Sequence, residues 1–161
     1  MRSETGASLV ELAMVVAIMG VLAAIAIPRG LQMQQNAVYR QEAMAIGAML
    51  REARSRTVSF NLENRVELDL TAGANRYRLV QGNASAGSTV WATVVRNWVN
   101  APQTVALAQA GCTGMAPPIF TVDFNPNGSA GVGCAITVLD VGGTVRRTIT
   151  ITQNTGRVRI S

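Results

Sequence analysis

An apolar segment from Ala7 to Ile27 constrains this chain more than any other feature, because Glu11 is its only charged side chain. As a helix rising about 1.5 Å per residue, a segment of this length spans roughly 30 Å, the thickness of the hydrocarbon core of a bilayer. A carboxylate near one end of such a helix costs on the order of 2–3 kcal/mol to insert. The segment therefore predicts a membrane-spanning helix in which Glu11 needs a cationic partner.

A secretory signal peptide or a plain membrane anchor is the ordinary alternative. The apolar run is longer than a usual signal-peptide core, and no Ala-x-Ala-like cleavage site precedes a clear mature start. The small residue that could mark a processing site, Gly6, lies before the apolar run. A plain anchor has no need of Glu11, so the pattern favours a segment whose carboxylate has a function.

The order of these residues resembles the N-terminal segment of type IV pilins and type II secretion pseudopilins. Those proteins have a short polar leader that ends in Gly, a Glu at the fifth mature position, and an apolar run of about 20 residues. Counted from Ala7, Glu11 is the fifth residue, and Pro28 stands where pilins commonly carry a helix-bending proline. The resemblance implies cleavage between Gly6 and Ala7 by a prepilin peptidase, followed by N-methylation of the new amine. Glu11 would then pair with the terminal amine of a neighbouring subunit.

The same resemblance implies a location and a set of partners. The chain would cross the inner membrane once with its globular part in the periplasm, and would later enter a cell-surface pilus. Its partners would be other pilins in the filament and the prepilin peptidase. The sequence departs from the pilin pattern in two respects. Ala7 stands where Phe is more usual, and Arg2, the only side-chain cation of the leader, is offset by Glu4.

The side-chain inventory argues against an enzyme. The 161 residues include no histidine and only two cysteines. This excludes Ser-His-Asp and Cys-His catalysis and every His-based metal site, and two cysteines alone cannot close a tetrahedral zinc site. We expect neither a catalytic role nor a metal or cofactor.

The two cysteines, Cys112 and Cys134, lie in turn-rich segments that contain several glycines. Outside the inner membrane they are expected to form a disulfide. Closing a loop of about 23 residues would stabilise the fold by roughly 3 kcal/mol in the chain-entropy model. The alternative is a pair of buried free thiols.

Helix is expected to continue beyond the membrane segment, because residues 31–57 contain no proline and only one glycine. Glu52 and Arg56 form a favourable i,i+4 pair on this helix. The segment Pro28-Arg29-Gly30 predicts a kink or local melting between the two halves. The apolar stripe of the second half is predicted to comprise Val38, Ala45, Ala48, Met49, Leu50 and Ala53.

The remainder of the chain predicts strands and turns. Alternating or β-branched runs lie at residues 66–70, 76–80, 89–99, 105–108, 119–124, 135–141, 144–152 and 157–161. The first two and the pair joined at Gly142-Gly143 are predicted hairpins. The fold class is therefore α+β: a long N-terminal helix packed on a C-terminal antiparallel β-sheet domain, as in type IV pilins. The expected divisions are a leader (1–6), a membrane helix (7–28), its amphipathic continuation (29–58) and a β-rich domain (59–161).

All fourteen basic side chains are arginines, and they give the chain a net charge of +5. No acidic side chain follows Asp140, whereas four arginines do: Arg146, Arg147, Arg157 and Arg159. Strand alternation places Arg157 and Arg159 on one face, about 6.6–7 Å apart, close to the spacing of successive phosphates along a nucleic-acid strand.

Strand alternation gives different predictions for Arg146 and Arg147. Ile149 and Ile151 are expected to face inward, so Arg146 shares the outward parity. Arg147 faces outward only if a β-bulge intervenes.

Gly156-Arg157-Val158-Arg159 resembles the Gly-Arg-x-Arg signature of FimT-type minor pilins, which share the GspH/FimT fold and bind DNA during natural transformation. The resemblance implies that Arg157 and Arg159 contact DNA phosphates, helped by Arg146 and Arg147. Gly156 would let the backbone turn sharply and approach the ligand.

Three alternatives remain open for the arginines. They could form a solvated face, serve protein contacts in a structural pseudopilin of type II secretion, or belong to a minor pilin that primes pilus assembly without touching DNA. Trp91 and Trp98 could stack on single-stranded bases, but packing on the protein itself is the ordinary role of such residues.

Overall fold

The structure is a computed structural model that describes residues 9–71, 73–116 and 118–161. The chain divides into two compact units, Met1–Ala37 and Val38–Ser161. One helix, α1 (Leu9–Phe60), contributes its first part to one unit and its second part to the other. The predicted processing residues Gly6 and Ala7 lie outside the described residues.

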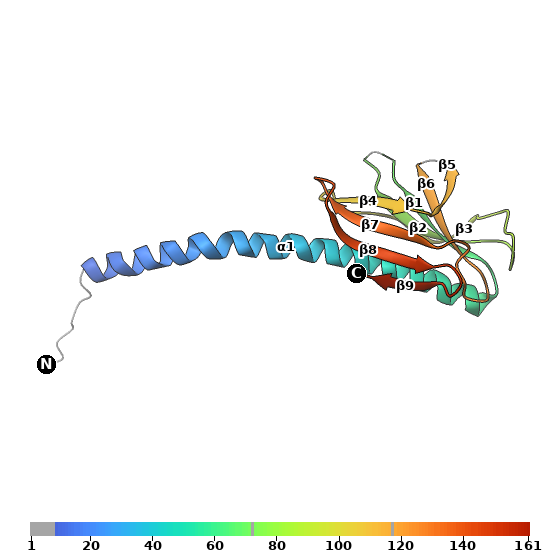
Figure 1. The fold of residues 1–161 in the computed structure, drawn as a ribbon, viewed down its shortest axis with the longest axis horizontal. Helices are drawn as coiled ribbons and strands as arrows, with labels where there is room; N and C mark the ends of the chain where they lie inside the picture. The colour runs from blue at the N-terminus through green and yellow to red at the C-terminus, as the bar shows by residue number, and fades with distance from the viewer. Residues whose placement is uncertain (1–8, 72, 117) are drawn as a thin grey trace. The chain divides into compact units, whose positions relative to one another are not determined.

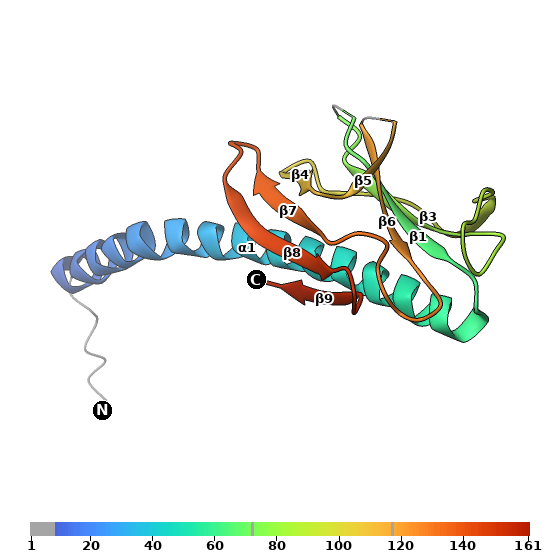
Figure 2. The same cartoon turned by 45° about the vertical axis from the view of Figure 1, so that its right-hand side comes forward.

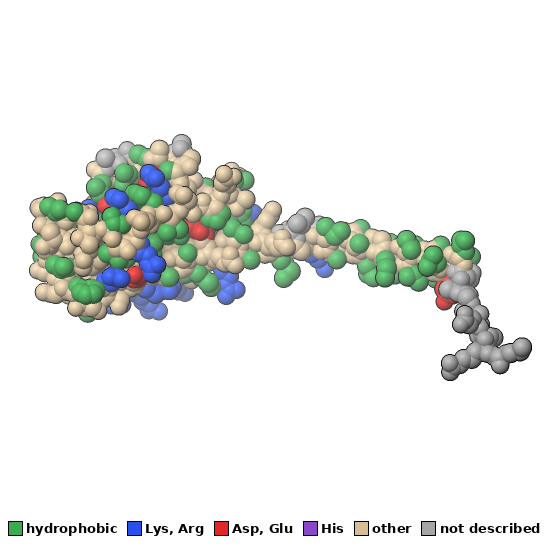
Figure 3. All heavy atoms as spheres, turned by 180° about the vertical axis from the view of Figure 1, so that it is seen from behind, with side chains coloured by type: hydrophobic (Ala, Val, Ile, Leu, Met, Phe, Trp, Pro, Cys, Tyr) green, Lys and Arg blue, Asp and Glu red, His purple; other side chains and the backbone are tan. Residues whose placement is uncertain are grey.

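The described part of the first unit is α-helix with exposed apolar side chains. Leu9 is 83% exposed and Ile27 is 62% exposed. Figure 3 shows hydrophobic side chains along this part of the helix. By length and composition, α1 is apolar enough to cross a membrane. Water solvates such a surface poorly, and exposed apolar surface of this extent is typical of segments that contact lipid or other protein chains.

The helix continues through residues 28–30, so the local melting predicted at Pro28-Arg29-Gly30 is absent. A proline removes its own N–H donor and crowds the carbonyl four residues earlier. One missing hydrogen bond does not end a helix that is propagated on both sides.

In the second unit α1 packs against the sheets through a stripe with alternating spacings of four and three residues. Met49, Leu50 and Ala53 are buried as predicted, but Ala45 and Ala48 are exposed. Ala45 and Ala48 directly precede the buried residues Ile46 and Met49. Because neighbouring residues of a helix are rotated by about 100°, these two alanines lie on its exposed side. The buried stripe follows Tyr39, Ala43, Ile46, Leu50, Ala53 and Thr57, with Glu42, Gly47 and Met49 buried beside it.

A five-stranded antiparallel sheet carries the predicted hairpin of residues 66–70 and 76–80 at its centre (Figure 1). In spatial order its strands are β3 (Thr93–Asn100), β2 (Arg76–Gln81), β1 (Asn64–Asp69), β6 (Ile119–Phe124) and β5 (Thr113–Ala116). The short strand β5 was not predicted. The strand predicted at 89–99 begins only at Thr93, because the backbone N–H groups of Thr89 and Val90 donate to Asn83 Oδ1 and hold a turn there.

A four-stranded sheet contains the second predicted hairpin and the end of the sequence. Its strands are, in spatial order, β4 (Val105–Ala110), β7 (Cys134–Asp140), β8 (Val145–Thr152) and β9 (Arg157–Ile160). All of its neighbouring strands are antiparallel. Strand β9 is an edge strand, and it lies beside the second part of α1 in both views (Figures 1 and 2).

A disulfide joins Cys112 to Cys134, as predicted, with their Cα atoms 4.9 Å apart. Cys112 lies where the chain leaves β4 for β5 of the other sheet, and Cys134 is the first residue of β7. The bond therefore holds the crossing between the two sheets at the end of the β4–β7 pairing.

Both sheets and the second part of α1 share one hydrophobic core. Its fully buried side chains include Ile46 and Leu50 from the helix, Phe124 from the five-stranded sheet and Ile149 from the four-stranded sheet. In the four-stranded sheet, β7 and β9 turn alternate residues toward this core, which leaves their other residues on the outer face.

Candidate nucleic-acid interface

Strand β9 presents its two arginines on the outer face of the four-stranded sheet. Arg157 and Arg159 are exposed, while Val158 and Ile160 are half-buried, which confirms the predicted alternation. Across the strand pair Arg159 lies opposite Thr150 and Arg157 opposite Thr152. A shallow hollow of about 430 Å³ is lined by Thr150, Thr152, Arg157, Arg159 and Ser161. Guanidinium and hydroxyl donors in this arrangement suit phosphate oxygens.

Gly156 turns the chain into β9 with a φ of 57°, a conformation that favours glycine. Its N–H donates to the carbonyl oxygen of Thr152 at 2.8 Å. The residue is buried, and a Cβ there would collide with the carbonyl oxygen of Gly128. The chain thus turns sharply at Gly156, as predicted. Its backbone closely approaches the turn around Gly128, whereas the prediction was a close approach to a ligand.

Arg146 and Arg147 lie at a β-bulge, the condition under which Arg147 was predicted to be exposed. The pairing shifts between Val138, which is opposite Arg147, and Leu139, which is opposite Val145. Arg147 is exposed. The next residue, Thr148, exchanges backbone hydrogen bonds with Ser161, which directly follows β9. Arg147 therefore lies beyond the end of β9.

The charge of Arg146 is engaged within the protein. Its Nη2 lies 2.7 Å from Asp140 Oδ2, and its guanidinium stands 5.6 Å from the centre of the Tyr39 ring. The backbone N–H of Thr144 and then the Arg146 guanidinium hold the pKa of Asp140 below its ordinary value. This carboxylate therefore stays ionised and keeps Arg146 less available for a ligand than Arg147.

Two arginines of α1 lie beside β9 and were not predicted as site residues. A hollow of about 490 Å³ is lined by Arg51, Arg54, Ser55, Val58, Ser59, Gly156, Arg157 and Val158. The helix approaches β9 closely, because a Cβ on Gly47 would lie only 2.8 Å from Ile160 Cδ1. Arg51 and Arg54 are three residues apart, so the sequence already places them on one face of the helix. Only the tertiary structure shows that this face lies beside β9.

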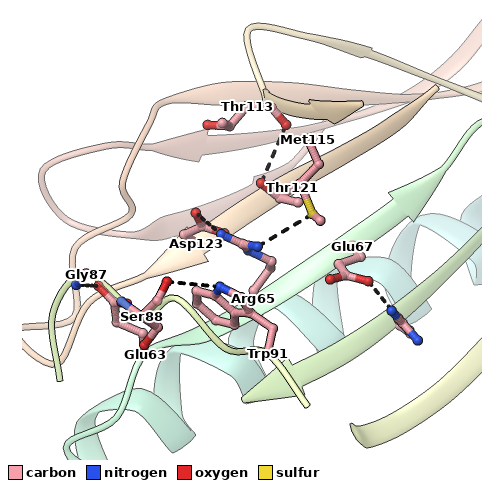
Figure 4. Close-up of polar contacts among 11 residues, drawn as sticks. Glu63, Arg65, Glu67, Gly87, Ser88, Trp91, Thr113, Met115, Thr121 and Asp123 are labelled. Carbon is pink, nitrogen blue, oxygen red and sulfur yellow. Dashed lines mark hydrogen bonds and ion pairs between the residues drawn. The ribbon is translucent and has the colours of Figure 1, made fainter. Parts of the chain in front are cut away.

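The outer face of the five-stranded sheet carries balanced charge instead. Three ion pairs join neighbouring strands there: Arg65–Asp123 at 2.6 Å, Arg78–Glu67 at 2.6 Å and Arg76–Asp69 at 2.9 Å. Figure 4 shows the first of these pairs and the carboxylate of the second. Positive and negative side chains are equal in number in these pairs, so this face offers little attraction to a polyanion.

Both tryptophans pack on arginines of this same face. The Arg65 guanidinium stands 3.8 Å from the centre of the Trp91 ring. Figure 4 draws both side chains. Trp98 is contacted by Arg76 at 4.7 Å and by Arg78 at 4.5 Å. These cation–π contacts favour packing on the protein over stacking on bases.

Six of the described arginines pair with carboxylates: Arg56, Arg65, Arg76, Arg78, Arg96 and Arg146. Among the described residues, no side-chain carboxylate lies within ion-pair distance of five arginines around β9: Arg51, Arg54, Arg147, Arg157 and Arg159. This group supplies an uncompensated positive surface, and we call it the β9 arginine surface.

No protein-family model matches the sequence, and no curated protein matches it at a significant level. Solved structures do match. The minor pseudopilin EpsH from the type 2 secretion system of Vibrio cholerae superposes with a TM-score of 0.58 at 14% identity, over 76% of this chain and 94% of that chain. The chain has a pilin-like fold.

A second pilin-like structure is equally similar. The type IV minor pilin FimU from Pseudomonas aeruginosa matches with a TM-score of 0.55 at 21% identity, over 76% of this chain and 91% of that chain. Neither match is a FimT-type protein, so DNA binding by the Gly156-Arg157-Val158-Arg159 segment stays a prediction. The similarity to these two structures shows the fold alone.

Proposed function

We propose that this chain is a minor pilin that joins a type IV pilus and binds extracellular DNA for uptake through Arg147, Arg157 and Arg159 of the β9 arginine surface. The observation that carries the proposal is the sorting of its arginines. Those of the five-stranded sheet are paired with carboxylates, whereas Arg157 and Arg159 stand exposed side by side without such partners among the described residues.

The first part of α1 supports the filament role. Its apolar side chains are exposed in the isolated chain, and neighbouring helices in a filament would cover them as lipid does before assembly. In that environment the Glu11 carboxylate needs a cation. After cleavage between Gly6 and Ala7 by a prepilin peptidase, the terminal amine of the adjacent subunit would supply it.

Arginine guanidiniums suit the DNA role because they donate two parallel hydrogen bonds to one phosphate. Contacts of this kind read the backbone and carry little sequence preference. They also release counterions, so the affinity falls steeply as salt rises. Arg157 and Arg159 would be the central phosphate ligands, and Arg147 would extend the surface beyond the end of β9.

The experiment is a titration of the full chain in detergent micelles with labelled duplex DNA, at about 50 and 200 mM salt. We expect Arg157→Ala/Arg159→Ala to weaken binding and to reduce the salt slope by about two, one for each lost contact. Arg29→Ala/Arg40→Ala removes the same charge from exposed positions of α1 and serves as the control. Unchanged binding by the β9 variant would refute the assignment.

A structural pseudopilin of type II secretion is the second candidate, and the similarity to EpsH favours it. In that case the arginines would contact other subunits. A strain that lacks the chain would then lose protein export and retain DNA uptake. A minor pilin that only primes assembly would instead be revealed by a loss of all piliation.

A further inference from the structure

We propose that the hollow between α1 and β9 is a phosphate subsite for the same DNA, with Arg51 and Arg54 of the helix as its ligands. The inference rests on the proposed DNA-binding function and extends it from the edge strand to the helix. Nothing in the Gly156-Arg157-Val158-Arg159 resemblance assigns a role to either helix residue.

The lining of the hollow has the chemistry of an anion site. Three arginines, Arg51, Arg54 and Arg157, line it together with Ser55, Ser59 and the apolar Val58 and Val158. No carboxylate side chain is among the residues that line it. A negatively charged group would therefore meet donors from two elements and no repulsion from the lining.

Arg54 is held in place before any ligand arrives. Its Nε donates to the carbonyl oxygen of Gly128 at 2.9 Å, which fixes the guanidinium against the turn after β6. Within the described part of the chain, its two terminal nitrogens have no hydrogen-bond partner. A preorganised guanidinium loses less side-chain entropy on binding than a free one, so its free donors are well suited to a phosphate.

Arg157 connects this hollow to the one on the outer face of β9. It lines both the hollow of about 490 Å³ beside α1 and the hollow of about 430 Å³ that contains Arg159. A phosphodiester chain that crosses β9 over Arg159 and Arg157 would bring its next phosphate to Arg54 and Arg51. The structure thus provides a continuous cationic track from the edge strand to the helix.

The test compares two double variants of the full chain in micelles by the same salt-dependent DNA titration. We expect Arg51→Gln/Arg54→Gln to weaken binding and to reduce the salt slope by about two. The matched control is Arg29→Gln/Arg40→Gln, which removes two exposed arginines from the same helix and should leave both quantities unchanged.

Arg54→Lys separates charge from structure, since lysine keeps the charge but cannot reproduce the bond from Nε to Gly128. We expect Arg51→Gln/Arg54→Lys to recover about one unit of the lost salt slope. A loss as large as in the double glutamine variant would overturn the subsite, because the effect would then come from the helix–turn contact.

The two proposals fail in different ways. If Arg51→Gln/Arg54→Gln binds like the wild type while Arg157→Ala/Arg159→Ala does not, the helix subsite is overturned and the β9 assignment stands. If the wild-type chain itself does not bind DNA, the proposed function fails and the subsite fails with it.

Discussion

Gly156 and Gly143 both have positive φ angles, of 57° and 81°, but their surroundings differ. A Cβ on Gly143 would meet nothing within 4 Å, whereas one on Gly156 would collide with the carbonyl oxygen of Gly128. The left-handed backbone accounts for glycine at both positions. Only at Gly156 does packing add a second requirement, because the turn into β9 is pressed against the turn after β6.

This difference predicts unequal costs for the same substitution. Gly143→Ala should lower the free energy of unfolding by about 1 kcal/mol through backbone strain alone. Gly156→Ala should cost at least about 1 kcal/mol more, because the added methyl group displaces backbone. Denaturant unfolding of the two variants in detergent measures the difference, and equal losses would contradict the packing.

Glu42 is a buried carboxyl on α1, 8% exposed, whose Oε1 has no hydrogen-bond partner among the described residues. Burial raises the pKa of Glu42, and the neighbouring Tyr77 hydroxyl only partly opposes the rise. The folded chain therefore holds this proton more tightly than the unfolded chain. Its contribution to stability is lost as pH rises from the ordinary value of 4.5 through the raised pKa.

Glu42→Gln removes that loss, because the amide stays neutral at every pH. We expect the stability of the variant, relative to the wild type, to increase as pH rises above about 4.5. Thermal unfolding of both chains between about pH 4.5 and pH 8 measures the difference, in which the titration of all other carboxyls cancels. A difference that does not change with pH would show that the carboxyl has an ordinary pKa.

At the scale of elements, sequence periodicity predicted the hairpins and the alternation of strand residues, which depend on residues close together in the sequence. The hairpins formed by β1 with β2 and by β7 with β8 follow from alternation and turn residues, and both strand pairings are present. The sequence also predicted correctly that Arg157 and Val158 lie on opposite faces of β9. Strand β5 was missed because it is short and contains Gly114, so its pairing with β6 comes from the tertiary fold.

Long-range contacts explain the part of the candidate site that the sequence did not reveal. Arg51 lines a hollow together with residues of β9, and Gly47 lies close to Ile160 of that strand. Arg146 was predicted as a DNA ligand from its position after Asp140, yet the hairpin turn places the two side chains together as an ion pair. The charge of an arginine is visible in a sequence, but its partner is set by the fold.

The disulfide between Cys112 and Cys134 should act on the crossing between the two sheets. Replacing both cysteines by serine is expected to lower the free energy of unfolding by about 3 kcal/mol, the chain-entropy cost of the opened loop. Denaturant unfolding gives the value. A loss well below 1 kcal/mol would mean that the β4–β7 pairing holds the crossing without the bond.

At the scale of the whole chain, two properties are separated along the sequence. The first part of α1 carries exposed apolar surface and the single carboxylate of Glu11, while the β9 arginine surface belongs to the second unit. The first property suits assembly, and the second suits recognition of an anion. Variants of one property are therefore expected to leave the other intact.

Incorporation into filaments tests the assembly proposal most directly. Filaments isolated from a host that carries the pilus machinery should contain the wild-type chain, shortened to begin at Ala7. Glu11→Ala should remain in the membrane fraction at normal levels and be missing from the filaments, while the control Leu12→Ala should be incorporated. Immunoblots and mass spectrometry of the two fractions measure this. Glu11→Ala filaments with wild-type content of the chain would contradict the proposal that Glu11 pairs with a neighbouring subunit.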